Sequence, residues 1–196
     1  MNVSDLISKF SSQGGVLGGI VNFAEDMTLV FNEFIYWSYL AGIALFVWGV
    51  YGLIVFKKPN NQTTGLAVNC RIFFGIIITQ MMFWFGQLND SVWEGSQPAV
   101  ALGYVEMARS NQEASPVAAG LLAVLALLTM IGVVCGFIAL YGFATIGSKQ
   151  DKHEALWKNT WMMVGGFILF NIMLVASDFA GSFLNISGPV ITASSF

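Results

Sequence analysis

The stretch VAAGLLAVLALLTMIGVVCGFIALYGFATI, residues 117–146, decides the fold of this chain. It contains no charged side chain over about thirty residues. A helix needs about 20 apolar residues to cross the roughly 30 Å hydrocarbon core of a bilayer. The stretch is therefore long enough to span a membrane, and it must tilt or project beyond the lipid.

Three further stretches have the length and composition of membrane spans. Residues 34–56 carry no charge, and residues 159–177 end just before Asp178. Residues 69–89 also cross if the side chain of Arg71 extends to the headgroups. Backbone groups in hydrocarbon need partners within their own segment, so these spans should be helices. We therefore expect an all-α membrane protein whose four transmembrane helices form two hairpins.

The composition supports this class. Charged residues make up 10% of the chain, against roughly a quarter in a soluble domain, and 56% of the residues are hydrophobic. Such a chain has the lipid bilayer as its natural partner. The net charge of -3 gives no electrostatic basis for direct binding to nucleic acid.

The sequence predicts five segments. They are an amphipathic N-terminal arm at the periplasmic surface (1–33), a first transmembrane hairpin (34–89), a periplasmic connection (90–115), a second transmembrane hairpin (116–184) and a periplasmic tail (185–196). Apolar residues follow helical spacing in the arm: Val3, Leu6, Ile7, Phe10, Leu17, Ile20, Val21, Ala24, Met27 and Phe31. This stripe predicts a helix that lies on the outer leaflet or against a partner subunit.

The basic residues predict the orientation. Six of the eight lie in or beside the two short loops that join the helices of each hairpin: Lys57, Lys58, Arg71, Lys149, Lys152 and Lys158. Short loops rich in Lys and Arg stay in the cytoplasm. We therefore expect both termini and the central connection on the outer side.

An internal repeat relates the two hairpins. A displacement of 90 residues aligns seven identical pairs: Gly42 with Gly132, Tyr51 with Tyr141, Gly52 with Gly142, Leu66 with Leu156, Asn69 with Asn159, Gly75 with Gly165, and Ile78 with Ile168. Both hairpins run in the same direction across the membrane. A duplication would therefore be parallel, unlike the inverted repeats of many transporters.

Small residues predict where the spans pack. Gly132 and Gly136 have the GxxxG spacing that lets membrane helices approach closely, and Ala139 continues the ridge. Gly165 and Gly166 lie in the last span. We expect these residues to form helix–helix contacts; the alternative is that glycine is simply frequent in membrane helices.

Two amides, Gln80 and Asn171, fall near the predicted bilayer centre of the second and fourth spans. Each needs a partner there, and a hydrogen bond between neighbouring helices would supply it. The other interpretation is that they line a polar path in an oligomer.

Side chains with catalytic or metal-binding chemistry are sparse. His153, the single histidine, stands beside Asp151 and Glu154 in a predicted cytoplasmic loop, which is weak support for a metal site. No nucleophile, base and acid can be assembled, nor a phosphate-binding loop. The sequence therefore predicts a protein that is not an enzyme, with no catalytic residue, metal or cofactor.

The last predicted span carries a family resemblance. The run WMMVGGFILFNI, residues 161–172, resembles a Gly-Gly…Asn-Ile signature of small inner-membrane proteins of type IVB secretion and conjugation systems. These are the IcmC/DotE-like proteins of the Dot/Icm apparatus and the TraQ-like proteins of IncI-type conjugative plasmids. The run GFIALYG, residues 136–142, is also similar.

The resemblance implies a non-enzymatic subunit in the bacterial inner membrane, oligomeric and assembled with other secretion-system subunits. Only Gly165, Gly166 and Asn171 match the signature by position. The alternatives are a small stand-alone channel or transporter, and a pilin-like subunit that moves from the membrane into a conjugative filament.

Overall fold

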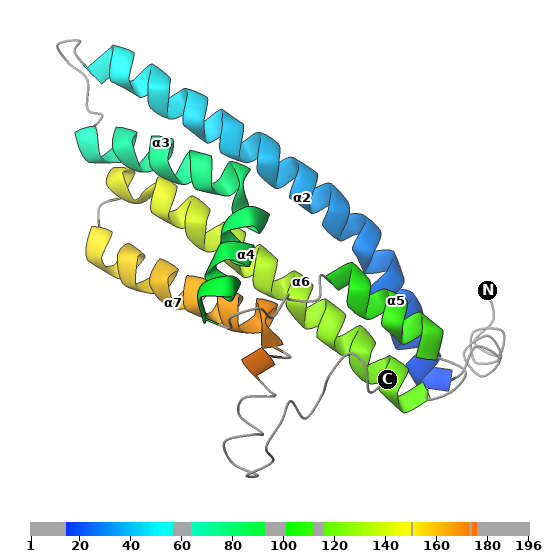
Figure 1. The fold of residues 1–196 in the computed structure, drawn as a ribbon. Helices are drawn as coiled ribbons and strands as arrows, with labels where there is room; N and C mark the ends of the chain where they lie inside the picture. The colour runs from blue at the N-terminus through cyan, green and yellow to red at the C-terminus, as the bar shows by residue number, and fades with distance from the viewer. Residues whose placement is uncertain are drawn as a thin grey trace, which may run out of the picture. The chain divides into compact units, whose positions relative to one another are not determined.

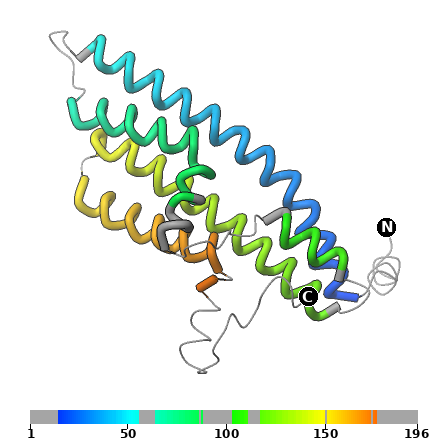
Figure 2. The backbone as a smooth tube through the Cα atoms, in the orientation of Figure 1, coloured from blue at the N-terminus to red at the C-terminus, as the bar shows by residue number. Residues whose placement is uncertain are grey.

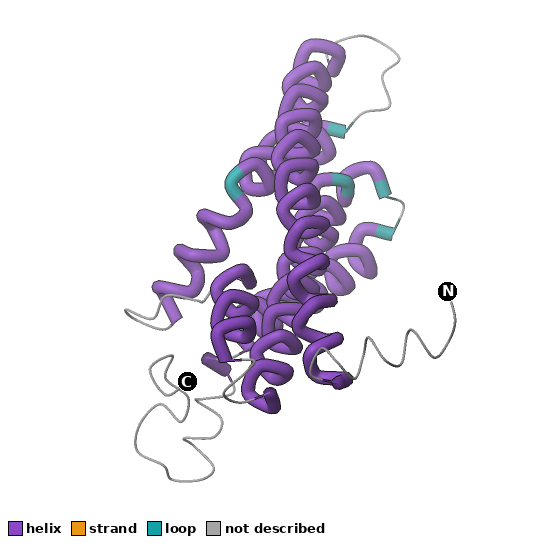
Figure 3. The backbone as a smooth tube through the Cα atoms, turned by 90° about the vertical axis from the view of Figure 1, so that its right-hand side faces the viewer, coloured by secondary structure: helices purple, strands orange, loops and turns teal. Residues whose placement is uncertain are grey.

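The computed structural model describes residues 15–56, 64–92, 101–111, 116–149, 151–172 and 174–175. Every regular element in this part of the chain is a helix (Figures 1 and 3). The helices are α2 (Gly15–Phe56), α3 (Gly65–Thr79), α4 (Met81–Val92), α5 (Ala101–Asn111), α6 (Pro116–Ala144), the 3₁₀ turn η1 (Ile146–Ser148) and α7 (Lys152–Phe170). The predicted all-α class is confirmed for the described residues.

Two of these helices are long and apolar enough to cross a membrane. The qualifying ranges are Gly15–Val55 in α2 and Val117–Ala144 in α6. The second nearly coincides with the uncharged stretch that decides the fold. Helix α3 is apolar but has only 15 residues, and α7 begins in a charged segment around Lys152 and Glu154.

Helix α2 differs from its prediction at residue 33. We expected the N-terminal arm to end there, but one helix of 42 residues runs through that position. No proline lies within it, and Glu25, Asp26 and Glu33 are compatible with helical backbone. At 1.5 Å per residue α2 is about 60 Å long, twice the thickness of the hydrocarbon core.

The chain divides into two compact units, which we describe separately. Unit 1 comprises residues 1–31, 98–131 and 169–196, and unit 2 comprises residues 32–97 and 132–168. Residues 1–14, Lys57, Lys58 and the predicted tail at 185–196 lie outside the described part of the chain.

Unit 1 is built around a core of small and branched side chains. The described parts of α2, α5 and α6 contribute it: Val21, Ala24, Tyr104, Val105, Ala108, Ala119, Leu122, Ala123 and Ala126. Alanines let the three helices approach closely, and Leu122 and Val21 fill the space between them.

This core adds detail to one prediction and corrects another. Residues 90–115, the predicted connection between the hairpins, contain α5 and the end of α4. The apolar stripe of the arm was expected to face the outer leaflet or a partner subunit. Instead, Val21 and Ala24 pack against α5 and α6 of the same chain. The sequence did not predict α5 as the partner of this stripe, because residues 101–111 have a weak apolar periodicity and include the charged Glu106 and Arg109.

Unit 2 is a set of helices packed side by side. Figure 1 shows α3 between α2 and α6, with α7 on the other side of α6. Ring contacts agree with this order: Phe74 of α3 stacks on Phe143 of α6, with centroids 5.2 Å apart. Phe85 of α4 lies 6.4 Å from Phe167 of α7.

The second predicted span is not one helix. Residues 69–89 were expected to form a single span, but α3 ends at Thr79 and α4 begins at Met81. The backbone tube changes direction between them (Figure 2). The cause lies in the residues around Gln80, which form the candidate site.

Candidate functional site

A close helix contact in unit 2 involves three of the predicted packing glycines. A Cβ atom on Gly166 of α7 would lie 2.8 Å from the Gly132 carbonyl oxygen and 2.9 Å from the Gly136 nitrogen of α6. Backbone thus meets backbone, which only a glycine allows. Gly165, by contrast, has no neighbouring atom within 4 Å of such a Cβ. Ala139 is fully buried on the same ridge.

The first hairpin makes the same contact. A Cβ on Gly75 of α3 would lie 3.1 Å from the Gly42 carbonyl oxygen and 2.7 Å from the Phe46 nitrogen of α2. Gly42 and Phe46 are displaced by 90 residues from Gly132 and Gly136. Gly75 is displaced by 91 residues from Gly166. The two hairpins therefore repeat one helix crossing.

A second pair of contacts gives the same register. Gly52 of α2 faces Val68 of α3, and Gly142 of α6 faces Asn159 of α7. The displacement is again 90 on the first helix and 91 on the second. The structure therefore supports the duplication but corrects its alignment: the second hairpin has one extra residue in its loop. Gly75 is equivalent to Gly166, and Val68, not Asn69, is equivalent to Asn159.

The corrected register makes Gln80 and Asn171 equivalent, because they are 91 residues apart. Each follows the last residue of a helix, Thr79 of α3 or Phe170 of α7. Beyond each amide the helical hydrogen bonds resume: the Trp84 N–H donates to the Gln80 carbonyl at 3.1 Å, and the Val175 N–H to the Asn171 carbonyl at 3.0 Å. Both hairpins therefore interrupt their second helix at the same place, at an amide residue.

Local hydrogen bonds explain the break at Gln80. The Thr79 hydroxyl donates to the Gly75 carbonyl at 2.8 Å, a bond that competes with the backbone and bends helices. The Gln80 N–H is shared between the carbonyls of Ile76 at 3.2 Å and Ile77 at 3.1 Å. The residue has φ -117° and ψ 29°, outside helical values. Gly75 thus serves both the helix crossing and the break.

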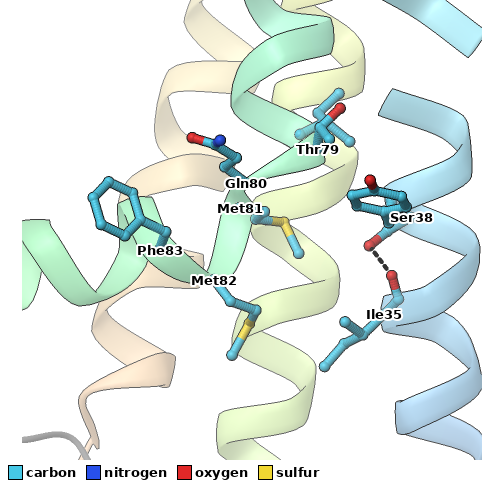
Figure 4. A pocket seen from close by; sticks show the side chains of 9 residues that line it. Ile35, Ser38, Thr79, Gln80, Met81, Met82 and Phe83 are labelled. Carbon is cyan, nitrogen blue, oxygen red and sulfur yellow. Dashed lines mark hydrogen bonds between the residues drawn. The ribbon is translucent and has the colours of Figure 1, made fainter. Parts of the chain in front are cut away.

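A pocket of about 480 Å³ opens beside this break (Figure 4). Its wall is mostly apolar, and the residues that line it come from α2 and from both sides of the break: Ile35, Ser38, Tyr39, Ile78, Thr79, Gln80, Met81, Met82 and Phe83. A smaller pocket of about 210 Å³ shares Thr79 and Gln80 with it. A volume of this size is typical of small-molecule sites.

Few polar groups face this pocket. The buried Ser38 hydroxyl donates to the Ile35 carbonyl at 2.7 Å (Figure 4), and the Thr79 hydroxyl is likewise used as a donor. Both hydroxyl oxygens keep acceptor capacity. The Gln80 side chain is exposed. Sequence reasoning identified Gln80 but missed Ser38 and Thr79. Thr79 could have been found from its position four residues after Gly75 and directly before Gln80.

The two amides have different surroundings. Gln80 belongs to unit 2 and is exposed, whereas Asn171 belongs to unit 1 and is 2% exposed. Each amide is therefore described within its own unit. Their equivalence lies in their position within each hairpin.

The predicted cytoplasmic side carries the basic residues. Lys149, Lys152 and Lys158 are exposed. Arg71 is half-buried, and its Nη2 donates to the Ser148 hydroxyl at 3.2 Å. The neighbouring Thr64 caps α3, because its hydroxyl accepts from the Ala67 N–H at 3.3 Å. It also donates to the Gly147 carbonyl at 3.2 Å. These bonds join the start of α3 to the turn before α7.

Reactive side chains do not gather in the described residues. No group of three or more His, Cys, Asp or Glu there has a geometry that could hold a metal ion. His153 is exposed near the start of α7. Cys70 and Cys135 are free thiols and half-buried.

Comparisons with known proteins add no relative. No family model, no curated protein and no solved structure matches this chain.

Proposed function

We propose that this chain is an integral membrane protein with four spans arranged as two parallel hairpins. Its first two spans are residues 34–56 of α2 and the interrupted pair α3–α4, and its last two are α6 and the segment that begins with α7. The loops with Lys57 and Lys149 face the cytoplasm, and both termini face the periplasm. The repeated helix crossing supports this arrangement, since each hairpin uses the same glycine contact.

The observation that carries the membrane assignment is the outer face of α2. Large apolar side chains are exposed along its second half: Tyr36, Trp37, Ile43, Phe46, Val47, Trp48, Val50, Tyr51, Leu53 and Ile54. Soluble monomers rarely expose so continuous an apolar surface. In a bilayer, lipid tails cover such a face without unfavourable exposure to water. Close packing at glycines then holds the helices together, because lipid removes the hydrophobic driving force for their association.

Within that membrane we propose a structural role, as a non-enzymatic inner-membrane subunit of a bacterial type IVB secretion or conjugation apparatus. The resemblance of residues 161–172 to that family supports it. Gly166 of this signature packs against the backbone of α6, and Asn171 follows the end of α7. The partners are further copies of this chain and other subunits of the apparatus.

A deletion strain tests this role. Removing the gene should abolish substrate transfer between cells, and the wild-type gene should restore it. Complementation with Gly165→Leu should also restore transfer, because that position is open, whereas Gly166→Leu should not. Affinity purification in mild detergent should recover other apparatus subunits with the wild-type chain. Normal transfer in the deletion strain would contradict the proposal.

One observation favours a second candidate, a small channel or transporter. Helices broken at corresponding positions of two repeats mark substrate sites in transporters. Here the breaks lie at Gln80 and Asn171, and a pocket opens at the first. Purified protein in liposomes would then carry an ion or solute flux that Gln80→Leu reduces. Liposomes no leakier than protein-free controls would exclude this candidate and leave the structural role.

A further inference from the structure

Arg71 has an unusual environment for a cation. Its guanidinium carbon lies 4.3 Å from the centroid of the Trp48 ring, and Nη2 donates to the Ser148 hydroxyl at 3.2 Å. The ring and the hydroxyl hold the guanidinium plane in place. Its Nε–H is buried and has no hydrogen-bond partner. The group is therefore oriented, but its donors are only partly used.

Among the described residues, no carboxylate lies near enough to Arg71 to form an ion pair. Among the described residues the ion pair that occurs is Arg109 with Glu25, so Arg71 has no acidic side chain within 4.0 Å there. The neighbouring residues 57–63 contain no acidic residue either. Arg71 lies seven residues after the N-cap of α3, about 10 Å along the helix. An arginine at that depth of a span requires an anion or interfacial water.

Hairpin packing does not require the arginine. The equivalent position of the second hairpin, 91 residues later, is Met162, and Trp48 corresponds to Ile138. An apolar residue therefore serves the same helix crossing. The two loop sequences are basic, since they and the start of α7 contain Lys57, Lys58, Lys149, Lys152 and Lys158 against the two acids Asp151 and Glu154. Such clusters on the cytoplasmic side attract anionic headgroups.

We propose that Arg71, held by Trp48 and Ser148, binds the phosphate of an anionic phospholipid of the inner leaflet. The guanidinium donates two parallel hydrogen bonds to phosphate oxygens, the geometry for which an arginine fork is suited. The acyl chains lie along the exposed apolar face of α2. This inference rests on the membrane arrangement proposed above.

The test uses the purified full-length chain in an uncharged detergent. The midpoint of thermal unfolding is measured against added phosphatidylglycerol, phosphatidylcholine or inorganic phosphate. Phosphatidylglycerol should raise the midpoint of the wild-type protein, phosphatidylcholine should raise it less, and inorganic phosphate should leave it unchanged. Arg71→Gln should weaken the apparent affinity for phosphatidylglycerol about ten-fold, the loss of one charge-assisted bond. Arg109→Gln, which removes one positive charge outside these basic loops, should bind as the wild type does.

Three results would overturn the site: equal protection by phosphatidylcholine, equal protection by inorganic phosphate, or an unchanged affinity in Arg71→Gln. If that variant does not fold, native mass spectrometry of the wild-type protein still decides, because phosphatidylglycerol must be retained over phosphatidylcholine. Membrane fractionation separates this outcome from failure of the fold proposal. A chain that stays in the membrane after alkaline washing but shows no lipid preference lacks the site, whereas a chain in the soluble fraction contradicts the membrane arrangement itself.

Discussion

Unit 1 and unit 2 hold their helices together by different means. In unit 1, side chains from α2, α5 and α6 bury one another, and Leu122, Ala108 and Ala126 have no exposed surface. In unit 2, backbone meets backbone at Gly42 and Gly75 and again at Gly132 and Gly166. Unit 1 also carries an exposed ion pair between Arg109 and Glu25.

The difference is one of packing mode. Burial of side chains stabilises helix packing when the alternative is water. Lipid offers no such gain, so helices there depend on close backbone approach and shape. Unit 1 is held by buried side chains, and unit 2 by close backbone contacts at glycines. The predictions that follow test this contrast.

The largest effect is expected in the core of unit 1. Leu122→Ala removes a side chain with no exposed surface and should cost about 3–5 kcal/mol of stability. Leu121→Ala is the matched control, because the adjacent leucine is 51% exposed. Thermal unfolding followed by circular dichroism measures both. Equal losses in the two variants would mean that Leu122 does not belong to the side-chain core described for unit 1.

Gly166→Leu should destabilise unit 2 by about 2–3 kcal/mol, because the new side chain meets backbone atoms of α6 that cannot rotate away. Gly165→Leu should be neutral or slightly stabilising, since its site is open and leucine favours helix over glycine. Protease resistance of the detergent-solubilised proteins compares them. If Gly165→Leu were the more damaging change, the helix crossing would be rotated from the one described.

Alkaline pH should loosen unit 1 through Tyr104. Burial raises the pKa of its hydroxyl above the ordinary value near 10, so the neutral form is favoured in the folded state. The contribution of the neutral Tyr104 hydroxyl to folding stability is complete below about pH 10, and it is lost as the pH rises through the raised pKa. Unfolding midpoints measured from pH 8 to 11.5 should fall more steeply for the wild type than for Tyr104→Phe. Parallel curves would show that the hydroxyl reaches water.

The smallest effect belongs to the ion pair of unit 1. Glu25→Gln should cost less than about 1 kcal/mol, because both side chains are largely exposed, at 47% for Glu25 and 71% for Arg109. The loss should vanish in 1 M salt, where screening removes the attraction between exposed charges. A larger cost that persists in high salt would place this pair in a low-dielectric environment and weaken the distinction between the units.

Composition and uncharged length were enough to predict the helical class and the bounds of α6. These signals are strong because lipid leaves the backbone no alternative to helix. The small-residue pattern also located Gly132, Gly136 and Gly166 correctly on facing helices. The duplication was visible in the sequence, but its one-residue offset was not, because identity alone paired Gly75 with Gly165.

Other features could not be predicted because they depend on tertiary partners. Residues 101–111 have a weak apolar periodicity, so the sequence alone does not predict α5. The helix is stabilised by packing against Val21 and Ala24 of α2. The helix break at Gln80 contains no proline that would predict it. It arises from the hydrogen bond that the Thr79 hydroxyl donates to the Gly75 carbonyl. Ser38 lines the pocket because α2 lies beside the helix break at Gln80.

Paired reporter fusions test the central claim, that the apolar helices cross the inner membrane with their basic loops inside. Alkaline phosphatase, which is active only outside the cytoplasm, is fused at Gly65 in the first loop and at Gly103 in the central connection. The account predicts no activity at Gly65 and strong activity at Gly103, with green fluorescent protein giving the opposite pattern. Phosphatase activity at Gly65, or an inactive fusion at both positions, would contradict it.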